Sequence, residues 1–252
     1  MEQVIKRRIC KHKDGTSEHT EDIVALEKKV RISVNGKDVV SIYCTPDMVR
    51  EFIVGFVMTE GIIRGSWCAE RMSIEYGDEI RVDIPAEGEV SMGEKIFTSG
   101  CVGGLTFERN EVLEPISDPF TIKKDDLRRL FSLFQSRSEL YRLTGCIHSA
   151  ALSDGKDILC FAEDIGRHNA VDKIIGFALI EQIPFTGKIM LASGRISSEI
   201  SSKCSRWGIP VLVTRTAPTN LAIEIAEKRG VTIVGFMRGT RFNIYTHPER
   251  IL

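Results

Sequence analysis

The sequence predicts an α/β protein with a three-layer C-terminal domain and a smaller N-terminal α+β domain. In the C-terminal half, helical patterns alternate with apolar runs such as Ile189–Ala192, Val211–Val213 and Thr232–Phe236. Strands that are apolar throughout are typical of a sheet covered by helices on both faces. In the N-terminal part, short strands surround a single helical pattern. We therefore expect domains at 1–95 and 123–252, joined by a connector at 96–122.

The N-terminal strands and helix are predicted from local signals. Residues 1–22 are polar and are expected to form an edge strand and a loop, and Asn35-Gly36 supplies the turn of a hairpin. Thr45 is expected to cap a helix with Pro46 at its first position, and Gly61 to end it. The predicted strands are Val30–Val34, Val39–Tyr43, Met72–Tyr76 and Ile80–Ile84.

The C-terminal domain is predicted to begin with a long amphipathic helix, Asp125–Leu143, which Gly145 ends. A hairpin follows, with its turn at Ser153-Asp154-Gly155. Helices and strands then alternate up to a closing strand. The expected elements are strands Ile147–Leu152 and Ile158–Ala162, helix Asn169–Ile180, strand Lys188–Ala192, helix Ile196–Trp207, strand Pro210–Thr214, helix Pro218–Arg229, and strands Val231–Phe236 and Phe242–Thr246.

Composition excludes several classes of function. The chain has 252 residues, of which 42% are hydrophobic and 27% charged, as in ordinary soluble globular proteins. A formal net charge of −1 predicts no nucleic-acid partner and no membrane partner. The sequence holds neither a membrane-spanning apolar run nor a basic leader followed by an apolar segment, so we expect a cytoplasmic protein.

One cysteine stands in a glycine-rich segment, Thr98-Ser99-Gly100-Cys101-Val102-Gly103-Gly104. Glycine permits positive φ, so the segment predicts a turned or mobile loop. Small neighbours leave the sulfur accessible, as a nucleophile or sulfur carrier requires. The alternative is a glycine turn in which Cys101 is a small buried hydrophobic residue.

The seven cysteines show no C-x-x-C spacing, which argues against a zinc knuckle and a thioredoxin-type pair. Cys10-x-His12 is only weak support for a metal site. The order of elements is similar to the cytidine-deaminase-like fold, but zinc deaminases need H-x-E and P-C-x-x-C motifs. His148 is followed by Ser149-Ala150, and no cysteine pair follows a proline, so we expect no zinc and no deamination.

Three predicted strand-to-helix turns are rich in polar groups: residues 163–169, 193–198 and 215–220. In a parallel sheet such turns share the carboxyl edge, where helix N-termini favour phosphates. The last strand adds Phe236–Arg241, whose arginine forks match phosphate or the edge of guanine. We therefore favour a nucleotide-like anionic ligand, with simple helix capping as the alternative. The candidate binding residues are Arg167, His168, Ser193, Arg195, Thr216, Phe236, Met237, Arg238, Gly239, Thr240 and Arg241.

Two histidines admit alternative interpretations. His168 and Asp172 are four residues apart, so they can form a proton-handling or ligand-orienting pair on one helix face. A cap plus an ordinary surface pair is an equally good explanation. His148, on a predicted strand, is expected to be a hydrogen-bonded core histidine rather than a ligand.

Five ordered segments, TSGCVGG, EDIGRHNAVDK, SGRISSE, APTNLAIE and GFMRGTRFNIY, together resemble the FdhD/NarQ family of formate dehydrogenase accessory sulfurtransferases. Asn35-Gly36 and the segment from Val54 to Gly61 add to the likeness, which runs from about Val30 to Tyr245.

The resemblance implies a cytidine-deaminase-like α/β domain with a smaller N-terminal domain, and a homodimer. It implies transfer of persulfide sulfur from a cysteine desulfurase to the molybdenum (or tungsten) bis(molybdopterin guanine dinucleotide) cofactor of formate dehydrogenase. The cofactor is bound as substrate, and GDP is expected to mimic it. By position, Cys101 matches the persulfide-carrying cysteine and Phe236–Arg241 the cofactor-binding segment.

The sequence departs from one form of the family pattern, because Cys101 is followed by Val102-Gly103-Gly104 rather than by a second cysteine. This favours a single-cysteine carrier over a disulfide relay. Two other functions stay open at this point: a non-catalytic chaperone of the molybdenum cofactor, and a nucleotide-binding regulatory module with an incidental thiol.

Overall fold

The computed structural model of the chain describes residues 2–90, 95–98, 104–107 and 114–252. Its largest part is a six-stranded sheet, the large sheet, with strand order β12-β11-β13-β14-β15-β16. Strands β13, β14 and β15 are parallel to one another, while β11 and β16 are antiparallel to their neighbours. The strands are β11 (His148–Ser153), β12 (Ile158–Asp164), β13 (Ile189–Ala192), β14 (Val211–Thr214), β15 (Thr232–Arg238) and β16 (Arg241–Ile244).

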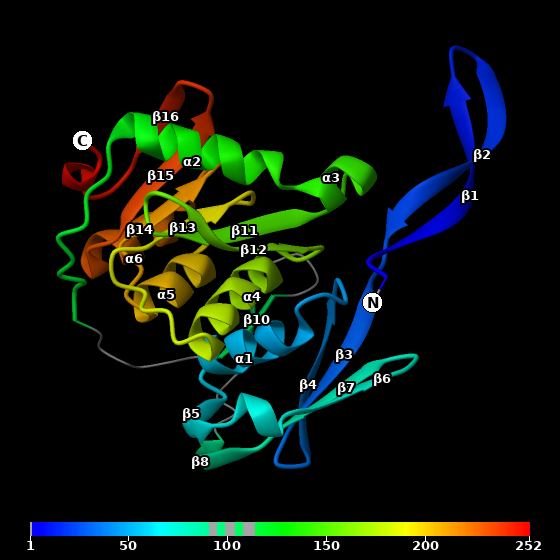
Figure 1. Cartoon of the computed structure of the whole chain (residues 1–252), viewed down its shortest axis with the longest axis horizontal. Helices are drawn as coiled ribbons and strands as arrows, with labels where there is room; N and C mark the ends of the chain where they lie inside the picture. Colours follow the sequence, from blue (N-terminus) through cyan, green and yellow to red (C-terminus); the bar gives the residue numbers. More distant parts are fainter. Residues whose placement is uncertain (1, 91–94, 99–103, 108–113) are drawn as a thin grey trace.

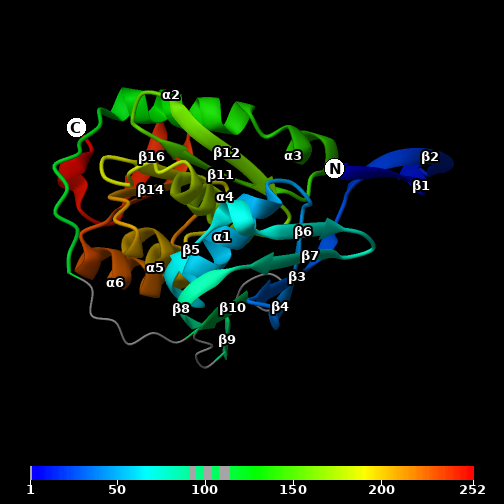
Figure 2. The same ribbon diagram turned by 60° about the horizontal axis from the view of Figure 1, so that its bottom comes forward.

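Helices cover both faces of the large sheet (Figures 1 and 2). On one face lies α2; on the other lie α4, α5 and α6, and each face has its own apolar cluster. The central strand β14 is fully buried, which explains its uninterrupted apolar run. This three-layer arrangement is the one that the sequence predicts. The helices are α2 (Lys124–Ser136), α3 (Glu139–Thr144), α4 (Arg167–Ile180), α5 (Ser198–Arg206) and α6 (Asn220–Arg229), with a short 3-10 helix, η2 (Pro248–Arg250), near the end of the chain.

The N-terminal part centres on a four-stranded sheet, the small sheet, with order β4-β3-β7-β6, and on helix α1. The predicted Asn35-Gly36 turn is confirmed, with φ of 52° and 74°. Two further strand pairs, β5–β8 and β9–β10, were not predicted. The elements are β3 (Lys28–Val34), β4 (Lys37–Cys44), α1 (Val49–Thr59), β5 (Ile63–Trp67), η1 (Ala69–Arg71), β6 (Ser73–Tyr76), β7 (Ile80–Ile84), β8 (Ala86–Val90), β9 (Lys95–Thr98) and β10 (Gly104–Phe107).

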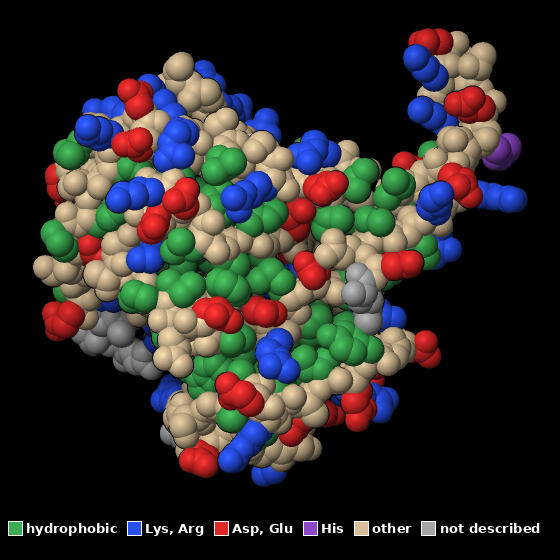
Figure 3. All heavy atoms as spheres, viewed as in Figure 1, with side chains coloured by type: hydrophobic (Ala, Val, Ile, Leu, Met, Phe, Trp, Pro, Cys, Tyr) green, Lys and Arg blue, Asp and Glu red, His purple; other side chains and the backbone are tan. Residues whose placement is uncertain are grey.

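Two ten-residue strands, β1 (Val4–Lys13) and β2 (Thr16–Ala25), form an arm that extends away from the rest of the molecule (Figure 1). Basic and acidic side chains lie along its length (Figure 3). The expectation of one strand and a loop at 1–22 is therefore wrong. The Asp14-Gly15 pair, with φ of 50° and 80°, makes the hairpin turn.

Helix α1 packs closely against α4 through two glycines, Gly55 and Gly176. A Cβ on Gly55 would lie 1.8 Å from the carbonyl oxygen of Asp172, and one on Gly176 would lie 1.8 Å from that of Glu51. No larger residue fits at either position without moving a helix. This contact joins the N-terminal part to the helical layer of the large sheet.

Two predicted helix boundaries are wrong. Helix α1 begins at Val49, not at Pro46, because the backbone N–H of Thr45 donates to Asp164 and its hydroxyl accepts from the N–H of Ile165. The predicted helix Asp125–Leu143 is two helices, α2 and α3. They separate at Ser138, whose hydroxyl bonds to Ser149 and Glu163 of the large sheet.

The other predicted elements are present, with ends shifted by a few residues. The domain limits at 95 and 122 stay a prediction. Among the described residues, no helix is both long and apolar enough to cross a membrane.

Candidate functional site

The polar turns after β12, β13, β14 and β15 meet at one edge of the large sheet, which we call the carboxyl edge. Their meeting follows from the topology, because β13, β14 and β15 are parallel and β12 runs in the same direction as β13. The start of β11 lies at the same edge, since His148 pairs with Asp164. The structure thus brings together the three turns and the last strand as the sequence predicts.

Backbone hydrogen bonds join three of these segments into one surface. The N–H of Ile196 donates to the carbonyl of Ala217 (3.2 Å), and the N–H of Thr219 donates back to Ile196 (3.0 Å). The N–H of Phe236 donates to the carbonyl of Thr216 (2.7 Å). The turns after β13 and β14 and the end of β15 therefore hold one another in place.

Phe236 has an unusual backbone conformation, with a φ of 53° in a residue that is not glycine. It lies where the pairing of β15 with β16 shifts between Gly235 and Arg238. Such outliers persist where the surrounding structure imposes them, and they are frequent at functional sites. Here the imposing contact is the Phe236–Thr216 hydrogen bond.

The predicted binding residues differ in how much of them a ligand can reach. Arg195, Arg238, Gly239, Thr240 and Arg241 are exposed, and Ser193, Thr216 and Phe236 are half-buried. Met237 is buried in the apolar cluster beneath α2, so its side chain belongs to the core and not to a ligand site. Arg215, after β14, adds a further exposed guanidinium.

His148 lies at the carboxyl edge, half-buried, rather than in the core as expected. Its Nδ1 is 3.3 Å from the hydroxyl of Ser193, which also accepts the N–H of Ser149 (2.9 Å). Burial, and then the charges of Arg167 and His168, lower the pKa of His148, so the ring is neutral near pH 7. A side chain on Gly194 would meet Arg167 and His148 at 3.1–3.2 Å, so glycine permits their close approach.

His168 pairs with α5 instead of with its own helix. Its Nε2 lies 2.8 Å from Oε2 of Glu199 and 3.1 Å from the hydroxyl of Ser197, which itself donates to Glu199 (2.6 Å). The predicted His168–Asp172 pair is therefore wrong. Both partners of His168 lie in the segment SGRISSE, but only the fold shows their contact.

Asp172 forms a buried ion cluster with residues from two other helices. Nζ of Lys203 lies 2.6 Å from Oδ2 of Asp172, 2.9 Å from Oε1 of Glu60 and 3.0 Å from the hydroxyl of Thr59. Burial raises the pKa of Asp172. Burial also opposes the charge of Lys203, but the two carboxylates together outweigh it and raise the pKa of Lys203. Through these contacts the cluster connects the end of α1 to α4 and α5.

A second buried pair, Lys173 with Asp164 at 2.7 Å, supports the turn after β12. Asp164 accepts from the N–H groups of Thr45 (3.1 Å) and Gly166 (2.8 Å) and from the amide of Asn169 (2.9 Å). The adjacent Asp172-Lys173 within an apolar helix was a sequence signal for buried ion pairs, although it did not identify their partners.

Cys101 lies outside the described residues, as do its neighbours at 99–103. The antiparallel strands β9 and β10 flank that segment, with Thr98 opposite Gly104. Its role stays a prediction. Of the cysteines that the structure describes, Cys10 and Cys146 are exposed and Cys68 is half-buried. In the same part of the chain, no group of three or more His, Cys, Asp or Glu residues is arranged to hold a metal ion.

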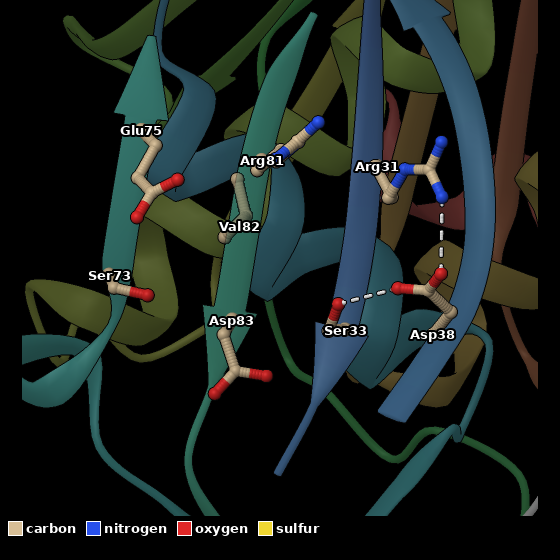
Figure 4. A pocket seen from close by; sticks show the side chains of 8 residues that line it. All are labelled: Arg31, Ser33, Asp38, Ser73, Glu75, Arg81, Val82 and Asp83. Atoms are coloured by element: carbon tan, nitrogen blue, oxygen red, sulfur yellow. Dashed lines mark hydrogen bonds and ion pairs between the residues drawn. The ribbon is translucent and has the colours of Figure 1, made fainter. Parts of the chain in front are cut away.

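A cavity of about 430 Å³ lies on the outer face of the small sheet (Figure 4), and none of its lining residues is a predicted binding residue. Among the lining residues, Asp38 accepts from Arg31 (3.2 Å) and from Ser33 (3.0 Å), and Asp83 accepts from the backbone N–H of Gly36 (2.7 Å). Nearby, Glu79 binds three basic side chains, and its pKa falls to about 2 because of its hydrogen bonds to Arg81, Lys29 and Arg31. These hydrogen bonds and ion pairs link neighbouring strands and turns of the small sheet. The cavity is lined by Arg31, Ser33, Asp38, Ser73, Glu75, Arg81, Val82 and Asp83.

Three comparisons with known proteins point to the same family. A family model described as the FdhD/NarQ family matches residues 25–252. Proteins named sulfur carrier protein FdhD include one from Geobacillus kaustophilus, 35% identical, covering 98% of this chain and 97% of the relative. Another, from Sulfolobus acidocaldarius, is 38% identical and covers 99% of both chains. A solved structure from Desulfotalea psychrophila, of a protein assigned as a formate dehydrogenase accessory protein, has a TM-score of 0.79, 26% identity and full coverage of both chains.

Proposed function

The chain belongs to the FdhD/NarQ family of sulfur carrier proteins that serve formate dehydrogenase, and we propose that it carries sulfur as a persulfide on Cys101. The proposed acceptor is the molybdenum bis(molybdopterin guanine dinucleotide) cofactor, bound as substrate at the carboxyl edge. The proposed donor is a cysteine desulfurase. We propose a cytidine-deaminase-like fold for the C-terminal part. We also propose that the protein acts as a homodimer.

The sulfur step is a thiol exchange that needs one thiolate on this chain. The Cys101 thiolate attacks the outer sulfur of the donor persulfide; a new S–S bond forms, and the donor cysteine leaves as a thiolate. In the second step the outer sulfur passes to the acceptor and Cys101 leaves as a thiolate. The two electrons that convert this sulfur to sulfide come from the acceptor.

The arrangement at the carboxyl edge is the observation that supports cofactor binding. Three segments fixed by mutual hydrogen bonds present the exposed guanidinium groups of Arg195, Arg215, Arg238 and Arg241. Arginine forks suit phosphate oxygens and guanine edges, and the start of α5 adds backbone N–H groups and the positive end of its dipole. Neutral His148 adds an uncharged hydrogen-bonding group at the same edge.

Restoration of formate dehydrogenase activity tests this function. Cells lacking their own carrier are supplied with wild type or Cys101→Ala, and enzyme activity is measured at equal protein levels. We expect wild type to restore activity and Cys101→Ala to fail. A cofactor chaperone without sulfur chemistry would retain function in Cys101→Ala. A regulatory module would bind free GDP more tightly than the complete cofactor, the reverse of our expectation.

A further inference from the structure

Helix α2 contacts the turn between β15 and β16 through one arginine, Arg128. Its Nη2 donates to the backbone carbonyl of Thr240 (2.8 Å), and its Nη1 donates to Asp125 on the same helix (3.0 Å). The guanidinium lies 5.5 Å from the centre of the Phe242 ring. Arg128 is thus fixed by three partners, two of which belong to the β15–β16 hairpin.

The turn that Arg128 contacts separates two arginines of the proposed cofactor-binding segment. Arg238 and Arg241 face each other across the hairpin, and Gly239 between them has a φ of 55°. All four residues from Arg238 to Arg241 are exposed. A short exposed turn with a glycine has few contacts of its own, so support from α2 reduces its freedom.

We propose that Arg128 is a positioning residue for the bound cofactor, an inference that rests on the proposed function of the carboxyl edge. By holding the Thr240 carbonyl and packing on Phe242, Arg128 fixes the turn before the ligand arrives. Arg238 and Arg241 then bind an anionic nucleotide without the entropic cost of ordering their backbone. Because Asp125 offsets the charge of Arg128, its contribution is chiefly geometric.

Arg129 provides a matched control. It is the next residue of α2, and its Nη2 also donates to a backbone carbonyl, that of Lys156 (2.8 Å). Lys156 lies in the β11–β12 turn, at the opposite end of the strands from the carboxyl edge. Arg128→Ala and Arg129→Ala therefore remove similar bonds from the same helix, and only the first touches the proposed binding segment.

Two measurements on the full chain test the inference: amide hydrogen exchange over 238–241, and the GDP dissociation constant. We expect Arg128→Ala to speed exchange in the turn and to raise the dissociation constant about 5- to 20-fold, as for loss of preorganisation. Arg129→Ala should leave the exchange rate over 238–241 and the GDP dissociation constant within about twofold of wild type, since distant sites act independently. In an Arg238→Ala, Arg241→Ala background, Arg128→Ala should have little further effect on GDP binding.

Unchanged exchange at 238–241 in Arg128→Ala would overturn the inference, as would an equal loss of GDP affinity in both single variants. The proposed function fails separately, if wild type binds no GDP. In that case the exchange comparison still decides whether Arg128 holds the turn.

Discussion

Nζ of Lys203 on α5 lies 2.6 Å from Oδ2 of Asp172 on α4, and the same ammonium reaches Glu60 at the end of α1. Asp172 and Lys203 are 1% and 6% exposed. One cation therefore compensates two carboxylates at the junction of three helices. This cluster connects the N-terminal part of the chain to the layer that supports the carboxyl edge.

Lys203→Met should strongly destabilise the protein. The variant leaves Asp172 and Glu60 buried without their cation, and breaking a buried pair costs about 3–5 kcal/mol. The measurement is the free energy of unfolding from urea denaturation. Adding Asp172→Asn to Lys203→Met should recover part of the loss, because it removes one uncompensated charge. If the free energy of unfolding of Lys203→Met were within about 0.5 kcal/mol of that of wild type, the ion cluster would not stabilise the protein as described.

Gly176→Ala should also destabilise, although alanine is the better helix former by about 1 kcal/mol. The new methyl group would meet the Glu51 carbonyl, so α1 must move away, at a cost of about 2 kcal/mol or more. Gly77→Ala is the control, since its Cβ would meet only the Glu79 carbonyl at an ordinary 3.6 Å. Thermal unfolding compares the two variants. Equal melting temperatures would refute the close helix contact.

Acid should weaken the small sheet through Glu79. The folded pKa of Glu79 is about 2, below its ordinary value of 4.5, so the ionised form is favoured by folding. Its contribution to stability is therefore present above pH 4.5 and is lost as the pH falls toward 2. Melting temperatures of wild type and Glu79→Gln should differ at pH 6 and converge near pH 2. A constant difference across this range would contradict the prediction.

Five of the described cysteines should fall into two classes of reactivity toward a maleimide at pH 7.5. Exposed Cys10 and Cys146 should be alkylated in the folded protein. Cys44, Cys160 and Cys204 should react only after unfolding, because burial raises the pKa of Cys44 and Cys160 to about 12 and raises that of Cys204 as well. Peptide mapping of the alkylated protein checks this order. Rapid labelling of Cys204 in the folded state would show that the helical layer opens.

The architecture was predictable where local signals decide it. Uninterrupted apolar runs such as Val211–Val213 report burial on both faces of a strand, and Asn35-Gly36 reports a hairpin turn. Asp14-Gly15 is also a hairpin-turn signal, but the residues on both sides of it are polar and do not look like strands. The arm was therefore not predicted. Charged strands without a buried face lack the alternation that marks most strands.

Features that depend on partners distant in the chain were not predictable. Thr45 carries the residue type of a helix cap, yet it binds the turn after β12. Ser138 breaks a regular helical pattern through contacts to Ser149 and Glu163. The sequence places His148 in the core because a strand pattern shows which residues alternate, but it does not show which residue lies at the edge of the sheet.

The candidate site also has features that the sequence predicts and features that depend on distant contacts. The turns and the arginines of Phe236–Arg241 stand out in sequence because glycine, arginine and hydroxyl residues gather at strand ends. The burial of Met237 and the contact from Arg128 required the packing of α2 against the sheet.

The most direct test of the central claim is the intact mass of the protein after incubation with a cysteine desulfurase and cysteine. Wild type should gain about 32 Da for each sulfur atom carried as persulfide. Cys146→Ala, which removes an exposed thiol, should gain the same mass, and Cys101→Ala should gain none. A gain on Cys101→Ala equal to that of wild type would move the carrier to another thiol and contradict the account. No gain on wild type, with a desulfurase shown to be active, would instead favour a cofactor chaperone.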